Sequence, residues 1–223
     1  MKGHAFAGAS VLVMSLMLLP ATAFLGLGVK PTGTAEGVKQ AQKVEGLKTE
    51  LKQICASTPN GVGASKQAKQ TINSIAQELN KLNKIKTPAK SKILRGKWRL
   101  LYSDVPGPSS GKIGPVQADV FQDLDLENMR VKNILELGPD WALRGALEAD
   151  AKILDNQTWQ ISFDYVYNNF LGTEVQRKQF DPNMENRIWN MTYLDSNFRI
   201  LYGNREGAAD SEEGFIFVME RAD

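Results

Sequence analysis

From Trp98 to the C-terminus, bulky apolar residues recur at every second position, a pattern typical of β-strands with one buried face. Residues 158–167 alternate most regularly, with polar residues at the intervening positions. The Asp155-Asn156 pair predicts a turn that joins this segment to residues 141–154 as a hairpin. The bulky side chains expected on one face of the segment are Trp159, Ile161, Phe163, Tyr165 and Tyr167.

About nine short strands follow from this pattern, which predicts a mainly β fold with helices at its N-terminal side. Residues 105–115, rich in glycine, proline and serine, predict a loop after the first strand. Many short strands separated by turns indicate an antiparallel barrel, with a β-sandwich as the alternative. The remaining strand segments are residues 96–103, 118–124, 130–137, 174–180, 187–195, 198–202 and 214–220.

Before the strands, the apolar period changes to that of amphipathic helices, over residues 38–55 and from Ser65 to about residue 82. Ser65 is the expected N-cap of the second helix. Helices this short depend on packing, so a helical hairpin should lie against the barrel. The two apolar stripes are Ala41, Val44, Leu47, Leu51 and Ile54, and Ala68, Ile72, Ile75, Leu79 and Leu82.

Charge is divided unevenly between these two parts. Residues 36–100 hold 14 Lys and Arg against 4 Asp and Glu, a net charge of +10, whereas residues 101–223 hold 11 against 21, a net charge of −10. A basic amphipathic arm could bind an anionic lipid surface or pack against its own acidic barrel. The basic stretch has no interleaved aromatic residues before Trp98, so a nucleic-acid partner is not expected.

Few catalytic chemistries are open to this composition. The single histidine, His4, lies in a segment expected to be removed, and the single cysteine, Cys55, falls on a helical apolar stripe and is expected in the core. We therefore predict no nucleophilic triad, no metal site and no cofactor. The acidic clusters lie near predicted turns, where carboxylates are usually solvated: Asp123, Asp125, Glu127, Glu212 and Glu213.

Two motifs stand out, one in the first strand and one near the C-terminus. The first consists of Leu94, Gly96, Trp98, Leu100, Leu101 and Tyr102; the second consists of Thr192, Tyr193, Leu194, Asp195, Arg199, Ile200, Gly203, Phe217, Val218 and Arg221. Together they resemble the plastid lipid-associated protein (PAP/fibrillin) family. The resemblance covers roughly residues 40–223 and implies a non-enzymatic protein associated with thylakoids or plastoglobules.

The N-terminus reads as a targeting leader. Residues 1–23 predict a signal peptide with an apolar run too short to span a bilayer and an Ala21-Thr22-Ala23 cleavage signal. Residues 24–35 resemble a transit peptide, and the combination resembles the bipartite leader of algal plastids; ordinary secretion is the alternative. A helical hairpin (36–95) and a barrel (96–223) would then form one domain.

A closed sheet of eight or more strands can enclose one small ligand, as in lipocalins, so we predict a lipocalin-like antiparallel β-barrel preceded by a helical hairpin. Asp195 and Arg199 could form a polar rim for a headgroup, or simply lock the Ser196-Asn197 hairpin turn. The alternative to a hollow barrel is one filled by its aromatics. The expected lining is Trp98, Leu100, Tyr102, Trp159, Phe163, Tyr165, Trp189 and Tyr193.

Three functions remain. The favoured one is binding of a lipid or another hydrophobic small molecule, such as an isoprenoid, quinone or pigment, with peripheral contact to a thylakoid or plastoglobule surface. The second is a structural subunit or assembly factor of a photosynthetic complex in the thylakoid. The third is an enzyme that uses carboxylates alone, which the lack of histidine disfavours.

Overall fold

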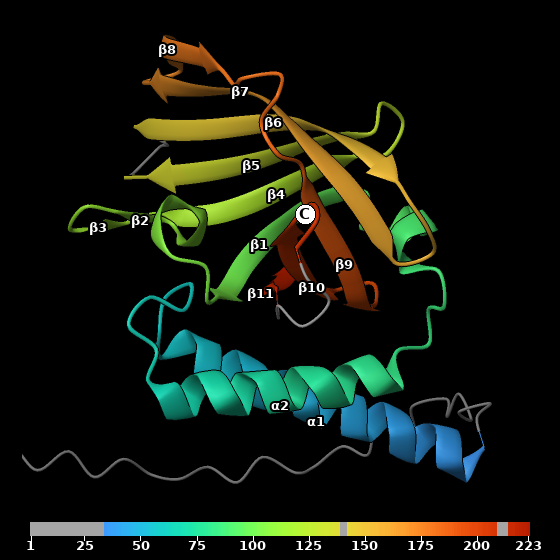
Figure 1. The fold of residues 1–223 in the computed structure, drawn as a ribbon. Coiled ribbons are helices and arrows are strands. Elements are labelled where there is room, and N and C mark those ends of the chain that lie inside the picture. Colours follow the sequence, from blue (N-terminus) through green and yellow to red (C-terminus); the bar gives the residue numbers. More distant parts are fainter. Residues whose placement is uncertain (1–33, 139–141, 209–213) are drawn as a thin grey trace, which may run out of the picture.

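A closed antiparallel barrel dominates the structure, a computed structural model that describes residues 34–138, 142–208 and 214–223 (Figure 1). Eight strands follow one another around the ring in chain order, and pairing of the last with the first closes it. They are β1 (Gly96–Ser103), β4 (Asp119–Asp125), β5 (Arg130–Leu137), β6 (Leu143–Ile153), β7 (Thr158–Phe170), β9 (Arg187–Leu194), β10 (Phe198–Arg205) and β11 (Phe215–Arg221).

This ring confirms the predicted barrel and rules out the sandwich, because β6 pairs with both β5 and β7 and leaves no free edge within the ring. Eight strands with up-and-down connectivity are the arrangement found in lipocalins. The predicted loop after β1 contains a short helix and a small hairpin. They are η3 (Gly107–Ser110), β2 (Lys112–Ile113) and β3 (Val116–Gln117).

The wall of the barrel divides along β7. Its first residues, 158–161, pair with β9, whereas residues 165–170 pair with β8 (Thr173–Gln179). Beyond Ile161 the paired strands β7 and β8 therefore diverge from β9, as the upper part of Figure 1 shows. This divergence opens one end of the barrel, while the other end stays closed.

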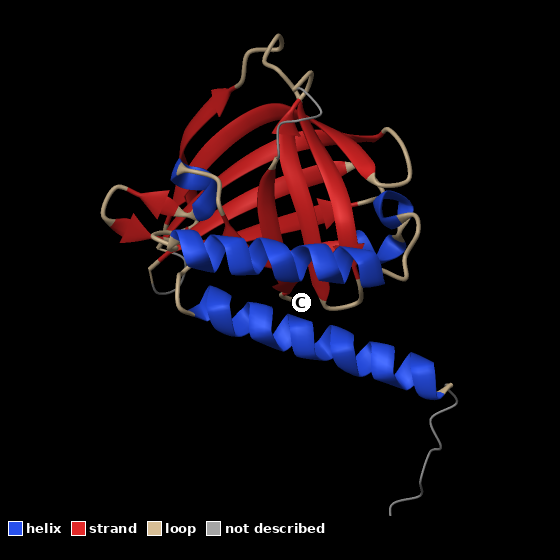
Figure 2. Ribbon diagram, turned by 60° about the horizontal axis from the view of Figure 1, so that its bottom comes forward, coloured by secondary structure: helices blue, strands red, loops and turns tan. Residues whose placement is uncertain are grey.

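Two helices cover the outer face of the wall formed by β1, β9, β10 and β11 (Figures 1 and 2). They are α1 (Ala35–Ala56) and α2 (Lys66–Leu82), and two short helices, η1 (Pro88–Lys90) and η2 (Lys92–Leu94), lead to β1. Ser65 caps α2 as predicted, because its side chain accepts from the backbone N–H of Ala68 at 3.1 Å. The α2 stripe is buried at Ile72, Ile75 and Leu79, whereas the α1 stripe is fully buried only at Leu51 and is exposed at Ala41, so the predicted hairpin packs on the barrel mainly through α2 and the second half of α1.

Two separate cores result from this arrangement. One fills the closed end of the barrel, and the other lies between the barrel wall and the helices. Cys55 belongs to the outer core, where it is 3% exposed and where burial raises the pKa of its thiol to about 12, as expected of a core residue. The predicted leader, residues 1–33 in particular, lies outside the described part of the chain.

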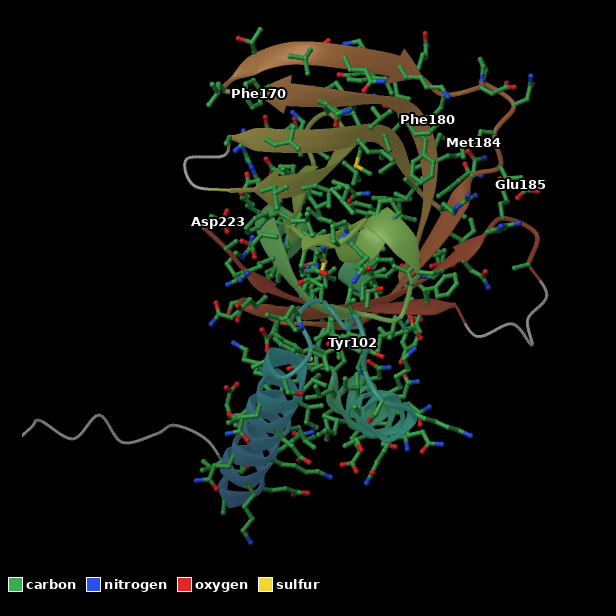
Figure 3. All side chains as sticks on the ribbon, turned by 90° about the vertical axis from the view of Figure 1, so that its left-hand side faces the viewer. Tyr102, Phe170, Phe180, Met184, Glu185 and Asp223 are labelled. Atoms are coloured by element: carbon green, nitrogen blue, oxygen red, sulfur yellow. The ribbon has the colours of Figure 1, made fainter. Side chains whose placement is uncertain are left out.

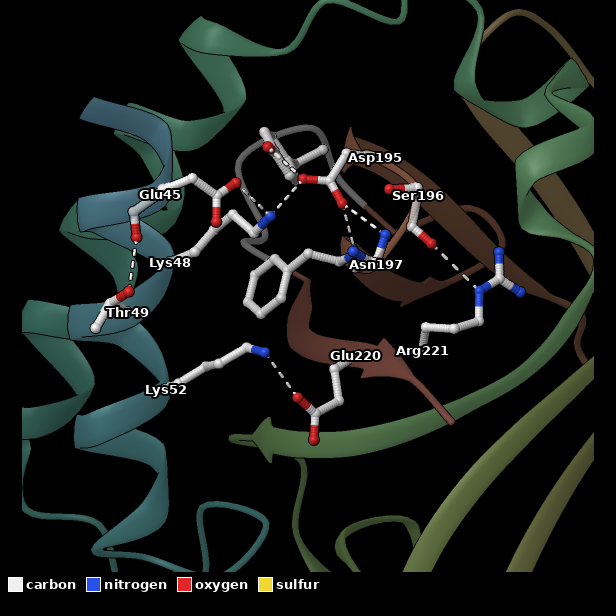
Figure 4. Close-up of polar contacts among 11 residues, drawn as sticks. Glu45, Lys48, Thr49, Lys52, Asp195, Ser196, Asn197, Glu220 and Arg221 are labelled. Carbon is white, nitrogen blue, oxygen red and sulfur yellow. Dashed lines mark hydrogen bonds and ion pairs between the residues drawn. The ribbon is translucent and has the colours of Figure 1, made fainter. Parts of the chain in front are cut away.

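Part of the basic arm is neutralised by the barrel (Figure 4). Lys48 of α1 lies 2.8 Å from Asp195 Oδ2, and Lys52 lies 2.9 Å from Glu220 Oε2. Tyr193 also donates to Asp195 at 2.9 Å. Packing against its own acidic barrel, one of the two expected roles of the arm, therefore accounts for these two lysines.

We expect Asp195→Asn to lower the free energy of unfolding by about 1.5 kcal/mol, the low end for hydrogen bonds to charged groups, because Asp195 is partly exposed. Burial raises the pKa of Asp195, but the hydrogen bonds from Lys48, Asn197 and Tyr193 outweigh it and lower the pKa overall. The carboxylate therefore stabilises the fold above its unfolded-state pKa, and this stabilisation is lost as pH falls through the folded-state pKa.

Urea unfolding between pH 3 and pH 7 measures this effect. The difference between the wild type and Asp195→Asn should be full at neutral pH and should shrink below about pH 4, where the carboxylate of the unfolded chain begins to take up a proton. Glu220→Gln, at the more exposed pair with Lys52, is the matched control and should cost less. A difference that does not change with pH would contradict the prediction.

Candidate functional site

The open half of the barrel encloses a cavity of about 810 Å³. Its wall is mainly apolar, with a small set of amides and two arginines. The apolar side chains include Leu100, Val120, Leu135, Leu147, Phe163, Val166, Phe180, Trp189, Phe215, Phe217 and Met219. The polar residues include Gln122, Asn133, Asn168, Arg187, Asn204 and Arg205.

The closed end of the barrel is packed solid. Trp98 is fully buried there, and its Nε1 donates to the carbonyl of Leu94 at 2.8 Å. Trp159 packs in the same core and donates to the carbonyl of Ala89 at 2.8 Å. Arg221 closes this end, because it lies 4.1 Å from the centre of the Trp98 ring and donates to the backbone carbonyls of Arg95 and Ile93.

Five of the eight residues predicted to line the barrel do face its interior. Leu100, Phe163 and Trp189 lie in the cavity wall. Trp98 and Trp159 are also interior, but they fill the closed end beneath the cavity. The interior is thus filled with aromatics at one end and hollow at the other. The two predicted alternatives, a hollow barrel and a barrel filled by its aromatics, each describe one half of it.

The prediction was wrong for three tyrosines. Tyr102 and Tyr193 belong to the outer core against the helices, and Figure 3 shows Tyr102 between barrel and helices. Tyr165 faces outward, where the guanidinium of Arg177 lies 4.2 Å from its ring centre.

A single extra residue in the strand explains each reversal. In β1 the pairing register shifts between Leu100 and Tyr102. In β7 it shifts between Phe163 and Tyr165, and in β9 between Met191 and Tyr193. In β7, for example, Glu148 pairs with Tyr165 but Ala149 pairs with Phe163, which leaves Asp164 as the extra residue. Since side chains alternate with a period of two, each β-bulge moves the residues beyond it to the opposite face.

Asp195 and Arg199 do not form a polar rim, which corrects that prediction. Asp195 lies at the closed end and accepts from the backbone N–H groups of Asn197 at 2.8 Å and Phe198 at 2.7 Å, so it locks the turn, the other role considered. Arg199 points into the interior and is fully buried. Asp195 therefore contacts Lys48 and Tyr193 on the side of the helices, whereas Arg199 lies inside the barrel beside Trp98.

Arg199 is the most unusual group near the cavity. Its Nη2 donates to Gln122 Oε1 at 2.5 Å and contacts the sulfur of Met219, while its Nε and Nη1 have no acceptor among the described residues. Burial, together with the positive charge of Arg221, lowers the pKa of Arg199 to about 9. The side chain therefore remains a cation at neutral pH.

Several lining residues were not predicted from the sequence. Gln122, Phe217 and Met219 follow the same alternation as Trp98 and Leu100, and reading β4 and β11 with that period would have found them. Phe180 has no such signal because it lies just after β8. Phe180 (Figure 3) still lies alongside β7, because its backbone N–H donates to the carbonyl of Asp164 at 2.9 Å, and its ring lies 5.5 Å from that of Phe163.

No helix in the described segments is both long and apolar enough to cross a bilayer. Within the same segments, no three residues among His, Cys, Asp and Glu are grouped so as to hold a metal ion.

Fold and cavity together define a class, namely a closed eight-stranded up-and-down barrel with a mainly apolar cavity open at one end. The chain belongs to the PAP_fibrillin family, whose model matches residues 45–209. This confirms the family indicated by the two strand motifs.

Two relatives from Arabidopsis thaliana agree with this membership. "Probable plastid-lipid-associated protein 5, chloroplastic" is 23% identical over 165 residues, which cover 73% of this chain and 67% of that protein. "Plastid-lipid-associated protein 6, chloroplastic" is 30% identical over 142 residues, half of each protein. Among solved structures, bovine odorant-binding protein in complex with its natural ligand is 11% identical, with a TM-score of 0.34 over 59% of this chain and 72% of that one.

Proposed function

We propose that this protein binds a lipid or another hydrophobic small molecule in the barrel cavity and acts in a plastid, at the surface of thylakoids or plastoglobules. It acts by binding rather than by catalysis. The cavity of about 810 Å³ is the observation that carries the proposal, because ligand pockets typically span about 300–1,000 Å³.

The lining of the cavity supports the same class of ligand. Aliphatic and aromatic side chains from seven strands of the ring face the hollow, namely those of β1, β4, β5, β6, β7, β9 and β11. Burying an apolar chain or ring there gains about 25 cal/mol for each Å² removed from water. The few amides and arginines can orient a polar group of the ligand.

The plastid location is proposed from the printed names of the two relatives, both chloroplastic plastid-lipid-associated proteins. Contact with a membrane surface would be peripheral and would use lysines of the helical arm that do not pair with the barrel. Lys69 and Lys81 are exposed examples on α2.

The test is to purify the protein gently from its native membranes and to analyse the extracted small molecules by mass spectrometry. We expect a hydrophobic compound in near-stoichiometric amount. When the delipidated protein is titrated with that compound, the fluorescence of Trp189 in the cavity wall should change, and Trp189→Phe should remove most of this change.

Recovery of the protein without any lipid or pigment, and no fluorescence change on titration, would contradict the proposal. Co-migration with a photosynthetic complex that is lost at high salt would then favour the second function, a structural subunit or assembly factor of such a complex.

A further inference from the structure

Arg199 is a buried cation for which the described residues supply no counterion. The side chain is fully buried, and within the described part of the chain the charge that acts on its pKa is the like charge of Arg221. Gln122 supplies a single neutral acceptor, and Met219 supplies a sulfur. Nε and Nη1 find no acceptor among the described residues.

Such an arrangement is costly in a folded protein. Buried charges are normally paired, because an ion loses its hydration when it leaves water. Neither Gln122 nor Met219 carries a charge that could compensate this loss. Loss of a proton does not remove this buried charge, because the pKa of Arg199, about 9, keeps the guanidinium charged at neutral pH.

The position of Arg199 connects this charge to the cavity. Along β10 the inward-facing positions run from Arg205 and Gly203 in the cavity wall, through Leu201 in the barrel core, to Arg199. Met219 of β11 pairs directly with Arg199 and lines the cavity, as does Gln122. Both partners of the guanidinium are therefore cavity-floor residues, and Arg199 lies immediately behind them.

We propose that Arg199 receives the carboxylate of an amphipathic acid whose apolar chain or ring occupies the cavity above it. This inference rests on the proposed function and narrows its ligand class from hydrophobic molecules in general to hydrophobic acids. The carboxylate enters between Gln122 and Met219, whose unbranched side chains can move aside without a change in the backbone.

The chemistry of the site favours a carboxylate over other head groups. The guanidinium fork matches the planar carboxylate, and hydrogen bonds between such ions are stronger than neutral ones. One carboxylate carries one negative charge and balances one arginine, whereas a phosphate monoester brings about −1.5 to −2. A neutral ester or alcohol would leave the buried charge uncompensated.

The experiment compares oleic acid with methyl oleate, which share a chain but differ in charge. The delipidated full chain is titrated with each at pH 8, and binding is followed by tryptophan fluorescence. We expect the wild type to bind oleate roughly tenfold or more tightly than the ester, as a hydrogen bond to a charged group implies. Dodecanoic acid and dodecyl phosphate, compared in the same way, separate a carboxylate from a phosphate head group.

Two variants test whether Arg199 causes the preference for the acid over the ester. In Arg199→Met the preference for acid over ester should fall below about twofold, because a similar volume without charge remains. Arg177→Gln, which removes a cation from the outer side of the barrel beside Tyr165 and outside the cavity wall, should keep the wild-type preference. Without ligand, Arg199→Met should melt at or above the wild-type temperature, since an unpaired buried charge has been removed.

The outcomes separate this inference from the proposed function. If the wild type binds methyl oleate as well as oleate, the inference is wrong while the proposed function stands. If it binds neither acid nor ester nor any extracted lipid, the proposed function fails first. Because the acid–ester comparison uses the wild type, it decides the question even if Arg199→Met does not fold. Tighter binding of dodecyl phosphate than of dodecanoate would overturn the choice of carboxylate.

Discussion

Trp98→Ala is expected to lower the free energy of unfolding by about 3–5 kcal/mol, the usual range for removing a buried tryptophan. Trp98 is fully buried at the closed end, so the substitution leaves a cavity in the part of the barrel that is packed solid. It also leaves the carbonyl of Leu94 without its donor. Arg221 and Arg199, 4.1 and 4.9 Å from the ring centre, lose the aromatic face that both contact.

Urea unfolding followed by far-UV circular dichroism measures this loss. Phe215→Ala is the matched control, since Phe215 is an aromatic residue of the same barrel but is 45% exposed at the cavity wall. The control should cost about 1 kcal/mol or less. A loss below about 1 kcal/mol for Trp98→Ala would mean that this end of the barrel is not the stabilising core.

Filling the cavity should abolish ligand binding while keeping the fold. Leu135 of β5 and Leu147 of β6 lie on adjacent strands and both line the cavity. In the double variant Leu135→Trp/Leu147→Trp the indoles would occupy space that the ligand needs. We expect the dissociation constant for the extracted ligand, or for oleate, to rise roughly tenfold or more, a loss of about 1.4 kcal/mol or more in binding.

The melting temperature of this variant should stay close to that of the wild type, because the added rings enter a hollow rather than a packed core. Val175→Trp on β8, where the side chain is 61% exposed and outside the cavity wall, is the control and should bind as the wild type does. Unchanged affinity in the double variant would place the ligand outside the barrel. A fall of more than about 10 °C would instead show that the site was already packed.

Most strand positions could be predicted from alternation, because the strands of the ring bury every second side chain over much of their length; β8, which is exposed throughout, is the exception. The segment predicted at residues 130–137 matches β5 exactly in its bounds, and the hairpin around Asp155-Asn156 joins β6 to β7 as expected. The helical hairpin followed similarly from its 3.6-residue period. These features depend on the periodicity of apolar residues, which can be recognised within a short stretch of sequence.

The lining was harder to predict, because a bulge adds one residue to a strand and leaves the composition of that strand unchanged. Tyr102, Tyr165 and Tyr193 all continue an apparently regular alternation, yet each lies beyond an extra residue and faces outward. Where a bulge falls is decided by the register with the neighbouring strand. No window along a single strand contains that information.

The amino-acid sequence was enough to indicate the family, the barrel and the helical hairpin, because these follow from motifs and periodicities that lie within short stretches. The hollow half of the barrel and the isolated charge of Arg199 arose only when strands distant in the sequence met. Whether an interior is full or hollow depends on the summed volumes of side chains from the whole ring. Whether an arginine has a counterion depends equally on which neighbours the closed sheet brings to it.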